Sequence, residues 1–496
     1  MHRSVILVLT LTSAWIFGAC SILVSKTLDD KSADGGGIAD LRVDGPNPGD
    51  RGPGEGIVPP NDAGPGENVP PPNDVMPDMP PPPPSFCPTT PISVSYSNNL
   101  LFDSLSLSAD SQGVIGLGYV TGTAMPGIFD GEMFYGFFES GASKLTPWTA
   151  DVSGWTSATA ELFTMATAQT GPPDRVHFFA TKRSSLGSSV DLHHFRGDPG
   201  GNPANITGDD IIMRSTQTLP APIEFAAAAG PDDVVYLVTI EQTPGGGTPT
   251  TQLSIWVVTP KNGGGYDYQR CHVYSSAGPS PSFPSIALSP DGTQVAVSFM
   301  DASATVARLI RGPVDAMKRC PSDVSEEVTT LGPAAMARFS LTVFDGGEVD
   351  LAGVDSSGDL KAWRCLFQQA CTESIIAPAT TAFFADAVNL LRKPGAHGVP
   401  NTTDPPPVIV TYAAQPPTGS PELHVAFPSG VVDTNTGELK WSPRGTFLIP
   451  GTPGQIATTL WSGDTSQGPG DAIHIAFEDL STSGSPHIQY FCAKLP

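Results

Sequence analysis

The chain has 496 residues, which is enough for two or three average domains or for one large all-β domain with appendages. Its 53 Gly and 52 Pro are well above ordinary usage and indicate many turns and few long helices. The formal net charge is −24 with only 25 Lys plus Arg, which argues against a surface that binds phosphate, so we expect no nucleic-acid partner.

Residues 1–19 have the pattern of a signal peptide. A short polar start is followed by an apolar run from Val5 to Phe17, which is too short to span a membrane comfortably as a mature helix. The stretch FGAC at residues 17–20 then resembles the lipobox of bacterial lipoproteins, with Phe17 where Leu is usual. The alternative is an ordinary secretory signal that happens to end near a cysteine.

The lipobox resemblance implies that Cys20 is lipidated and becomes the new N-terminus. Ser21 follows it where an Asp would signal retention in the inner membrane, so the resemblance implies an outer-membrane lipoprotein of the cell envelope, facing the periplasm or the cell surface. No later stretch reaches 18 consecutive apolar residues, so the expected contact with the membrane is through the lipid anchor alone.

Residues 20–86 are expected to form a disordered linker. Fifteen prolines fall within residues 44–86, among many Gly, Asp and Asn residues. Such a segment cannot bury enough apolar surface to offset its ordering entropy. Treated as coil or as extended chain, it reaches roughly 45 to 200 Å, so we expect a stalk that holds the domain at residues 87–496 away from a membrane.

The stretch PSIALSPDGTQVAVSFMD, Pro284–Asp301, predicts two strands around a tight turn at residues 290–292. Its second strand recurs along the chain at intervals of 54 to 65 residues. Each copy begins with a β-branched residue, and these residues are Val114, Val176, Val235, Val295, Val349, Val408 and Ile473. Three to four antiparallel strands in each of seven repeats predict an all-β fold, a seven-bladed β-propeller, with six or eight blades as alternatives.

The hairpin LSPDGTQVAVSF at residues 288–299 resembles the blade hairpins of the Tol-system periplasmic propeller and of bacterial sialidase-like propellers. The turn recurs in many unrelated propellers, so the resemblance implies a fold and not an activity. The Asp-box spacing and the arginine triad of sialidases have no counterpart in the sequence. A glycan-acting hydrolase of sialidase-like architecture stays an alternative because two carboxylates could meet from separate blades, and an envelope assembly scaffold is a second alternative.

Four of the seven second strands end in a carboxylate: Glu241, Asp301, Asp355 and Asp479. Equivalent positions of a propeller fall on one rim, so we expect these side chains to share a face. They could collect a Ca²⁺ ion, which prefers oxygen ligands, or a basic partner. The alternative is that Asp and Glu simply begin loops here.

The histidines offer weaker candidates. His193 and His194 are adjacent in a predicted strand, so their side chains point to opposite faces and cannot share one metal ion. His474 and His487 lie on neighbouring predicted strands of the last blade and could approach each other.

Six cysteines follow Cys20, an even number that suits an oxidising compartment. Cys365 ends a third strand and Cys371 opens a fourth, so we predict that they pair within one blade. Cys492 sits at the end of the last third strand and Cys87 precedes the first strand of the domain. We therefore predict that the N-terminal strand completes the last blade and that Cys87–Cys492 closes the ring, which leaves the pair Cys271–Cys320.

These features predict a monomeric, surface-anchored lipoprotein whose propeller binds an unknown protein or carbohydrate without catalysis. No catalytic residue is identified: the nucleophile-elbow, zinc-protease and phosphate-loop motifs do not occur in the sequence. We expect no cofactor other than the calcium ion that the four carboxylates would hold.

Overall fold

The computed structural model describes the chain from Cys87 to Leu495, with gaps before and between strands. The gaps are residues 89, 96–98, 101–104, 110–114, 126–127, 139–144, 150–161, 171–174, 184–189, 198–206, 215–220, 243–250, 277–280, 303–304, 315–327, 335–336, 367–368, 380–381, 384–387, 393–407, 417–419, 433–438, 450–452, 466–467 and 481–486. The predicted signal peptide, Cys20, the linker and Cys320 lie outside the described residues. The chain divides into two units, Met1–Asp78 and Met79–Pro496, and all described residues belong to the second.

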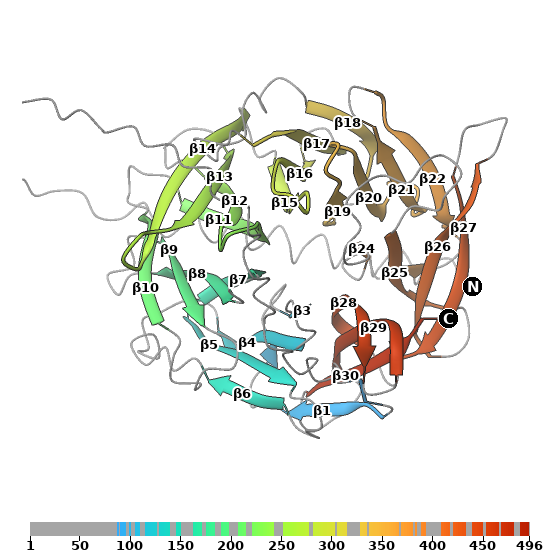
Figure 1. The fold of residues 1–496 in the computed structure, drawn as a ribbon, viewed down its shortest axis with the longest axis horizontal. Helices are drawn as coiled ribbons and strands as arrows, with labels where there is room; N and C mark the ends of the chain where they lie inside the picture. Colours follow the sequence, from blue (N-terminus) through green and yellow to red (C-terminus); the bar gives the residue numbers. More distant parts are fainter. Residues whose placement is uncertain are drawn as a thin grey trace, which may run out of the picture. The chain divides into compact units, whose positions relative to one another are not determined.

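The described residues form antiparallel sheets, seven in all, and in six of them the strands follow one another along the chain (Figure 1). The first three sheets contain the strands β2 (Asn99–Leu100), β3 (Ser106–Ala109), β4 (Ile115–Met125), β5 (Ile128–Phe138) and β6 (Leu145–Thr149); β7 (Leu162–Thr170), β8 (Arg175–Arg183), β9 (Val190–Gly197) and β10 (Thr207–Arg214); and β11 (Ala221–Ala229), β12 (Val235–Gln242), β13 (Thr251–Pro260) and β14 (Tyr266–Ser276). Over these described ranges no helix is long and apolar enough to cross a membrane.

The next three sheets contain β15 (Pro281–Leu288), β16 (Gln294–Asp301), β17 (Val306–Pro313) and β18 (Val328–Pro333); β19 (Ser340–Val343), β20 (Val349–Val354), β21 (Leu360–Cys365) and β22 (Thr372–Ala377); and β23 (Ala382–Phe383), β24 (Asn389–Arg392), β25 (Val408–Gln415), β26 (Glu422–Val432) and β27 (Leu439–Leu448). The last sheet joins β28 (Pro453–Thr465), β29 (Gly468–Asp479) and β30 (His487–Lys494) to β1 (Ile92–Ser95) from the start of the domain.

One inner strand of each sheet contacts its counterparts in the neighbouring sheets, and these contacts form a closed cycle. The contacts run from β3 to β7, β11, β15, β19, β24 and β28, and from β28 back to β3. A cycle of antiparallel sheets whose inner strands touch is a β-propeller, so the predicted all-β propeller fold is confirmed. The sheets can be followed around this cycle by colour in Figure 1.

The described members of the repeated β-branched column lie on β8, β12, β16, β20, β25 and β29, as the pattern predicts. The described members are almost completely buried: Val176, Val235, Val295, Val349, Val408 and Ile473. Val114 falls outside the described residues. Strands β12, β16 and β20 are buried on both faces, because each has a neighbouring sheet above and below it. This explains why these strands contain nearly continuous apolar runs.

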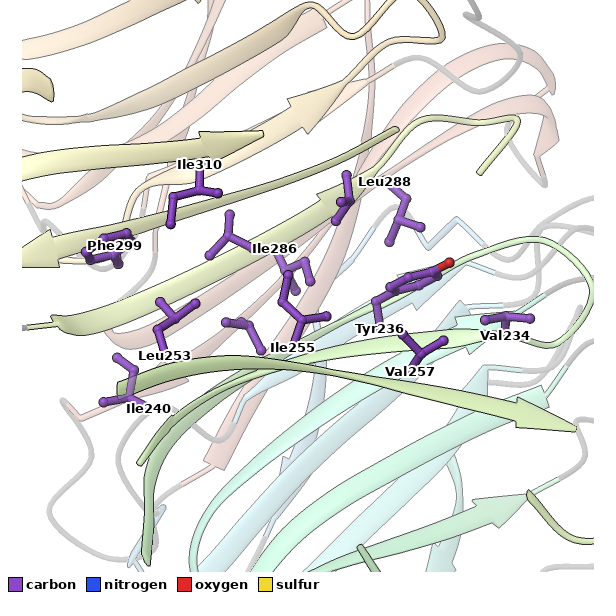
Figure 2. Close-up of a cluster of buried hydrophobic side chains, with 13 residues drawn as sticks. Val234, Tyr236, Ile240, Leu253, Ile255, Val257, Ile286, Leu288, Phe299 and Ile310 are labelled. Carbon is purple, nitrogen blue, oxygen red and sulfur yellow. The ribbon is translucent and has the colours of Figure 1, made fainter. Parts of the chain in front are cut away.

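The core consists of apolar clusters, each shared by two neighbouring sheets. In the cluster of Figure 2, Tyr236 and Ile255 from the sheet β11–β14 face Ile286, Leu288 and other side chains of the sheet β15–β18. Full burial of one such side chain stabilises the fold by about 1.5–3 kcal/mol. Similar clusters join most other pairs of neighbouring sheets, so the apolar interior holds the ring together between sheets as well as within them.

The turns between first and second strands also touch from sheet to sheet. The predicted turn after β15 forms, with the Gly292 N–H donating to the Ser289 carbonyl at 2.9 Å, and Gly292 has a φ of +70°. A Cβ at this glycine would lie 2.5 Å from Cδ of Pro231, which belongs to the preceding turn. The backbone N–H of Asp291 in turn donates to Asp345 in the following turn at 3.2 Å.

The ring closes as predicted, because a strand from each end of the domain pairs in one sheet. Strand β1 is antiparallel to β30, with Ile92 opposite Tyr490. Cys87 and Cys492 form a disulfide beside this pair, with their Cα atoms 5.1 Å apart across 405 residues of sequence. The last sheet therefore takes its outermost strand from the start of the domain.

The remaining cysteines follow the predicted pairing as far as the structure describes them. Cys365 and Cys371 form a disulfide within one sheet, across a separation of six residues. Cys271 is also disulfide-bonded. Its predicted partner, Cys320, lies outside the described residues.

Candidate functional site

The four predicted rim carboxylates occupy equivalent places in their sheets. Glu241, Asp301 and Asp479 are at the ends of β12, β16 and β29, and Asp355 directly follows β20. All four side chains are buried, with exposed fractions of 6% or less. We call these four residues the carboxylate rim.

Each member of the carboxylate rim is paired with a basic side chain of its own sheet. Arg308 on β17 donates to Asp301 at 2.8 Å, and Lys361 on β21 lies 3.1 Å from Asp355. His487 on β30 lies 3.3 Å from Asp479. Glu241 accepts from Arg270 on β14 and from Gln252 on β13.

These pairings compensate the four buried carboxylates without a bound metal ion. Burial alone would raise the pKa of Asp355, but the hydrogen bonds from Lys361 and from the Asp359 and Ser357 N–H groups hold it below its ordinary value. Over the part of the chain that the structure describes, no three His, Cys, Asp or Glu side chains gather in a way that could hold a metal ion. The structure therefore places the rim residues at equivalent positions without bringing them together.

A second polar cluster, which the sequence did not predict, lies between the sheets β7–β10 and β11–β14. Five side chains form a continuous hydrogen-bonded series: Asp233, His177, His194, Tyr268 and Asp210. We call this series the histidine chain. Asp233 and Tyr268 belong to the sheet β11–β14, whereas His177, His194 and Asp210 belong to the sheet β7–β10. The series therefore bridges the two sheets from the turn before β12 to the outer strand β10.

The distances along the histidine chain are all those of direct hydrogen bonds. Asp233 Oδ1 lies 3.0 Å from His177 Nε2, and His177 Nδ1 lies 2.9 Å from His194 Nε2. His194 Nδ1 is 2.9 Å from the Tyr268 hydroxyl, which is 2.9 Å from Asp210 Oδ2. The two imidazole rings are nearly parallel, with an angle of 8° between their planes.

A left-handed turn aims Asp233 at the neighbouring sheet. Asp232 and Asp233 have φ values of +57° and +61°, and the Val234 N–H donates to the Pro231 carbonyl at 3.2 Å across them. Two consecutive residues with positive φ give a tight turn of the kind that favours Asp, Asn and Gly. Non-glycine residues in this region cost of order 1 kcal/mol each, so the surrounding contacts must hold the turn in place.

Two further groups fix the Asp233 carboxylate. Arg175 Nη1 lies 2.6 Å from Asp233 Oδ2, and the Tyr266 hydroxyl donates to the same oxygen at 2.7 Å. Burial and the hydrogen bond to Asp233 raise the pKa of Tyr266 to about 12, so its hydroxyl keeps its proton. The Asp233 carboxylate thus has an arginine, a tyrosine and a histidine around it.

The side chains of this cluster can bind protons and transfer them to one another. His177 is fully buried, and His194 and Asp233 are at most 3% exposed, so no substrate atom reaches them directly. Burial lowers the pKa of His194 well below its ordinary value, and the nearby His177 and Arg196 lower it further. The arrangement resembles an internal relay more than a site that faces a ligand.

The other predicted histidine contacts are partly corrected. His193 and His194 do point to opposite faces, since His193 stacks on Phe195 while His194 joins the histidine chain. His474 and His487 are not partners, because their places in the β29–β30 register are several residues apart. His474 Nδ1 instead lies 2.7 Å from the Tyr490 hydroxyl.

No protein-family model matches the chain, and no curated protein matches it. Among solved structures, Trypanosoma rangeli sialidase in complex with the inhibitor DANA is 10% identical with a TM-score of 0.38, and the match covers 66% of this chain and 56% of the sialidase. Prolyl oligopeptidase B from Galerina marginata is 10% identical with a TM-score of 0.39, covering 75% of this chain and 46% of that one.

The β-propeller domain of the Trilobed protease from Pyrococcus furiosus is 8% identical with a TM-score of 0.39, and the match covers 79% of this chain and 96% of that domain. The chain therefore spans little more than half of the sialidase and less than half of the oligopeptidase. Matches with this identity and TM-score carry nothing about the activity of this chain.

Proposed function

We propose that the protein is a lipoprotein of the cell envelope that presents a β-propeller on a stalk and binds a protein or carbohydrate ligand without catalysis. The observation that carries the proposal is the disulfide between Cys87 and Cys492, together with the oxidised state of Cys271, Cys365 and Cys371. Disulfides of this kind persist in oxidising compartments outside the cytoplasm. The lipobox resemblance at Cys20 and the Pro-rich residues 44–86 support an anchor and a spacer in the same compartment.

We assign one blade to each sheet, which makes the propeller seven-bladed. The support is the closed cycle of contacts between inner strands, to which each sheet contributes one strand. Averaged electron-microscopy projections of the purified protein would count the blades directly. Six or eight densities around the ring would contradict the assignment.

Binding without catalysis is supported by the way the buried carboxylates are used. Every member of the carboxylate rim is held by a basic side chain of its own sheet, and Asp233 is held by Arg175. A glycosidase needs one carboxylic acid and one carboxylate that flank a bound sugar. Carboxylates committed to internal ion pairs are poorly placed for that work.

The test is a pair of measurements on the purified mature protein. Glycan and peptide arrays should reveal a ligand class, and the same preparation should leave chromogenic glycosides intact. Turnover of a glycoside that disappears on substitution of a single carboxylate would overturn the non-catalytic proposal in favour of the hydrolase. Retention of envelope proteins, with no binding on either array, would favour the assembly scaffold.

A further inference from the structure

The histidine chain has a proton count that its geometry fixes. Four contacts join its five members, and each contact needs one proton between the two atoms. With both carboxylates ionised and both imidazoles neutral, the histidine chain supplies only three protons. One comes from His177, one from His194 and one from Tyr268. A fourth proton is therefore required for every contact to be a hydrogen bond.

Without that proton, two lone pairs face each other at one contact. Each contact is 2.9 to 3.0 Å long, which leaves no room for a water molecule between the two atoms. A buried polar contact left without its hydrogen costs free energy comparable to a lost hydrogen bond. All four contacts can therefore be hydrogen bonds at the same time only if the histidine chain carries one additional proton.

Two positions of this proton complete all four contacts while Asp233 keeps its ion pair with Arg175 and His194 stays neutral. If a neutral His194 donates to His177, then Tyr268 donates to His194, and Asp210 must carry the proton to donate to Tyr268. If His177 instead donates to both Asp233 and His194, the proton makes His177 an imidazolium. In both arrangements His194 stays neutral, in agreement with the lowering of its pKa by burial.

The charged and titratable groups around the chain come from each neighbouring element. Arg175 on β8 is bonded to Asp233, and Tyr266 on β14 donates to the same carboxylate. The Arg196 guanidinium on β9 lies 5.1 Å from the centre of the Tyr266 ring. Both arginines favour the ionised carboxylates and oppose a charge on the imidazoles, so they weaken the binding of the extra proton and oppose a second one more strongly.

We propose that the histidine chain is a proton-binding site that makes the junction between the sheets β7–β10 and β11–β14 sensitive to pH. Asp210 is half-buried whereas His177 is fully buried, so water reaches the chain at the Asp210 end. Release of the proton to solvent opens the contact between Asp210 and Tyr268. That contact joins β10 to β14, the outermost strands of the two sheets.

A proton held by the folded histidine chain determines how the stability of the protein depends on pH. An unfolded chain binds a proton on each of the two histidines below their ordinary pKa of about 6.5 and none above it. The folded histidine chain holds one proton on both sides of this value. Unfolding of the protein therefore takes up one proton below about pH 6.5 and releases one above it. The contribution of the histidine chain to the free energy of unfolding is therefore largest near that pH.

The decisive variant is Asp210→Asn in the full-length mature protein. An asparagine NH₂ group can donate to the Tyr268 oxygen, so all four contacts are hydrogen bonds without the extra proton. We expect the unfolding equilibrium constant of the wild type to rise about tenfold per pH unit above pH 6.5, relative to that of the variant, until the chain loses its proton. Urea unfolding from pH 6 to pH 9 measures this difference.

Asp267→Asn is the matched control, because Asp267 lies on the same strand as Tyr268 and its side chain is 71% exposed. Its pH profile should parallel that of the wild type. If Asp210→Asn does not fold, Tyr268→Phe serves instead, because the two contacts it leaves between Asp233 and His194 need only the two imidazole protons. Parallel profiles of the wild type and the folded variant above pH 6.5 would overturn the proposal.

Discussion

Cys87 and Cys492 lie with their Cα atoms 5.1 Å apart although 405 residues separate them, and their disulfide accompanies the pairing of β1 with β30. The first and last strands of the domain thus share one sheet, and a covalent bond holds them there. A propeller that is closed in this way cannot open at the junction of its two ends without breaking either the disulfide or the fold of that sheet.

Removal of this disulfide should cost much more stability than removal of the local one. In the loop-entropy model a bridge across about 400 residues contributes about 6 kcal/mol, whereas one across six residues contributes about 2 kcal/mol. Urea unfolding of Cys87→Ser/Cys492→Ser should therefore show a larger loss than Cys365→Ser/Cys371→Ser. Equal losses in the free energy of unfolding would mean that the long bridge does not reduce the conformational entropy of the unfolded chain more than the local one does.

The contact between successive turns should make Gly292 intolerant of a side chain. Gly292→Ala places a residue at φ +70° and puts its Cβ 2.5 Å from Pro231 Cδ, so we expect a loss of about 1–3 kcal/mol. Gly263→Ala is the matched control, because Gly263 also has a positive φ, +104°, but nothing lies within 4 Å of its Cβ position. A similar loss in both variants would show that the contact with Pro231 contributes nothing.

Burial of His474 should destabilise the protein in acid. Burial lowers the pKa of His474 to about 3, while the unfolded side chain titrates near 6.5. The unfolded chain therefore binds one more proton than the folded chain between these values, and stability falls by about 1.4 kcal/mol for each pH unit of acidification. His474→Gln, whose amide can still bond the Tyr490 hydroxyl, should show a shallower decline by one proton in urea unfolding between pH 4 and pH 6. An unchanged slope would contradict burial of a neutral His474.

Calcium should leave the melting temperature unchanged. Each carboxylate of the rim already has a basic partner, and in the described ranges no metal-binding group of side chains forms. An ion that bound only the folded state would raise the melting temperature by mass action. A rise in millimolar calcium that Asp301→Asn abolishes would restore the predicted calcium site.

The sequence predicted the architecture well because each repeat carries local information. The turn at Pro290 and the β-branched residue at the start of each second strand depend only on neighbours in sequence. The pairing of Cys87 with Cys492 was also predictable, since Cys492 stands where Cys365 stands in an earlier repeat.

The histidine chain was not predicted because its members come from different strands of two sheets. His177 and Asp233 are 56 residues apart, and Tyr268 and Asp210 are 58 apart. The only signal was that histidines occur on two successive strands of one repeat, at His177 and His194. The same limit explains the carboxylate rim: the sequence placed its members at equivalent positions but could not show that each one pairs with a basic residue of a later strand in its own sheet.

The most direct test of the proposed anchored, extracytoplasmic propeller is fractionation of cells that express the Cys20→Ser variant. The account predicts that the wild-type protein is found with the membranes, and that the variant is released as a soluble, oxidised protein without lipid. The control variant Asp267→Asn, which changes an exposed side chain, should be found with the membranes like the wild type. Retention of Cys20→Ser in the membrane fraction, or recovery of the protein with reduced cysteines from the cytoplasm, would contradict the account.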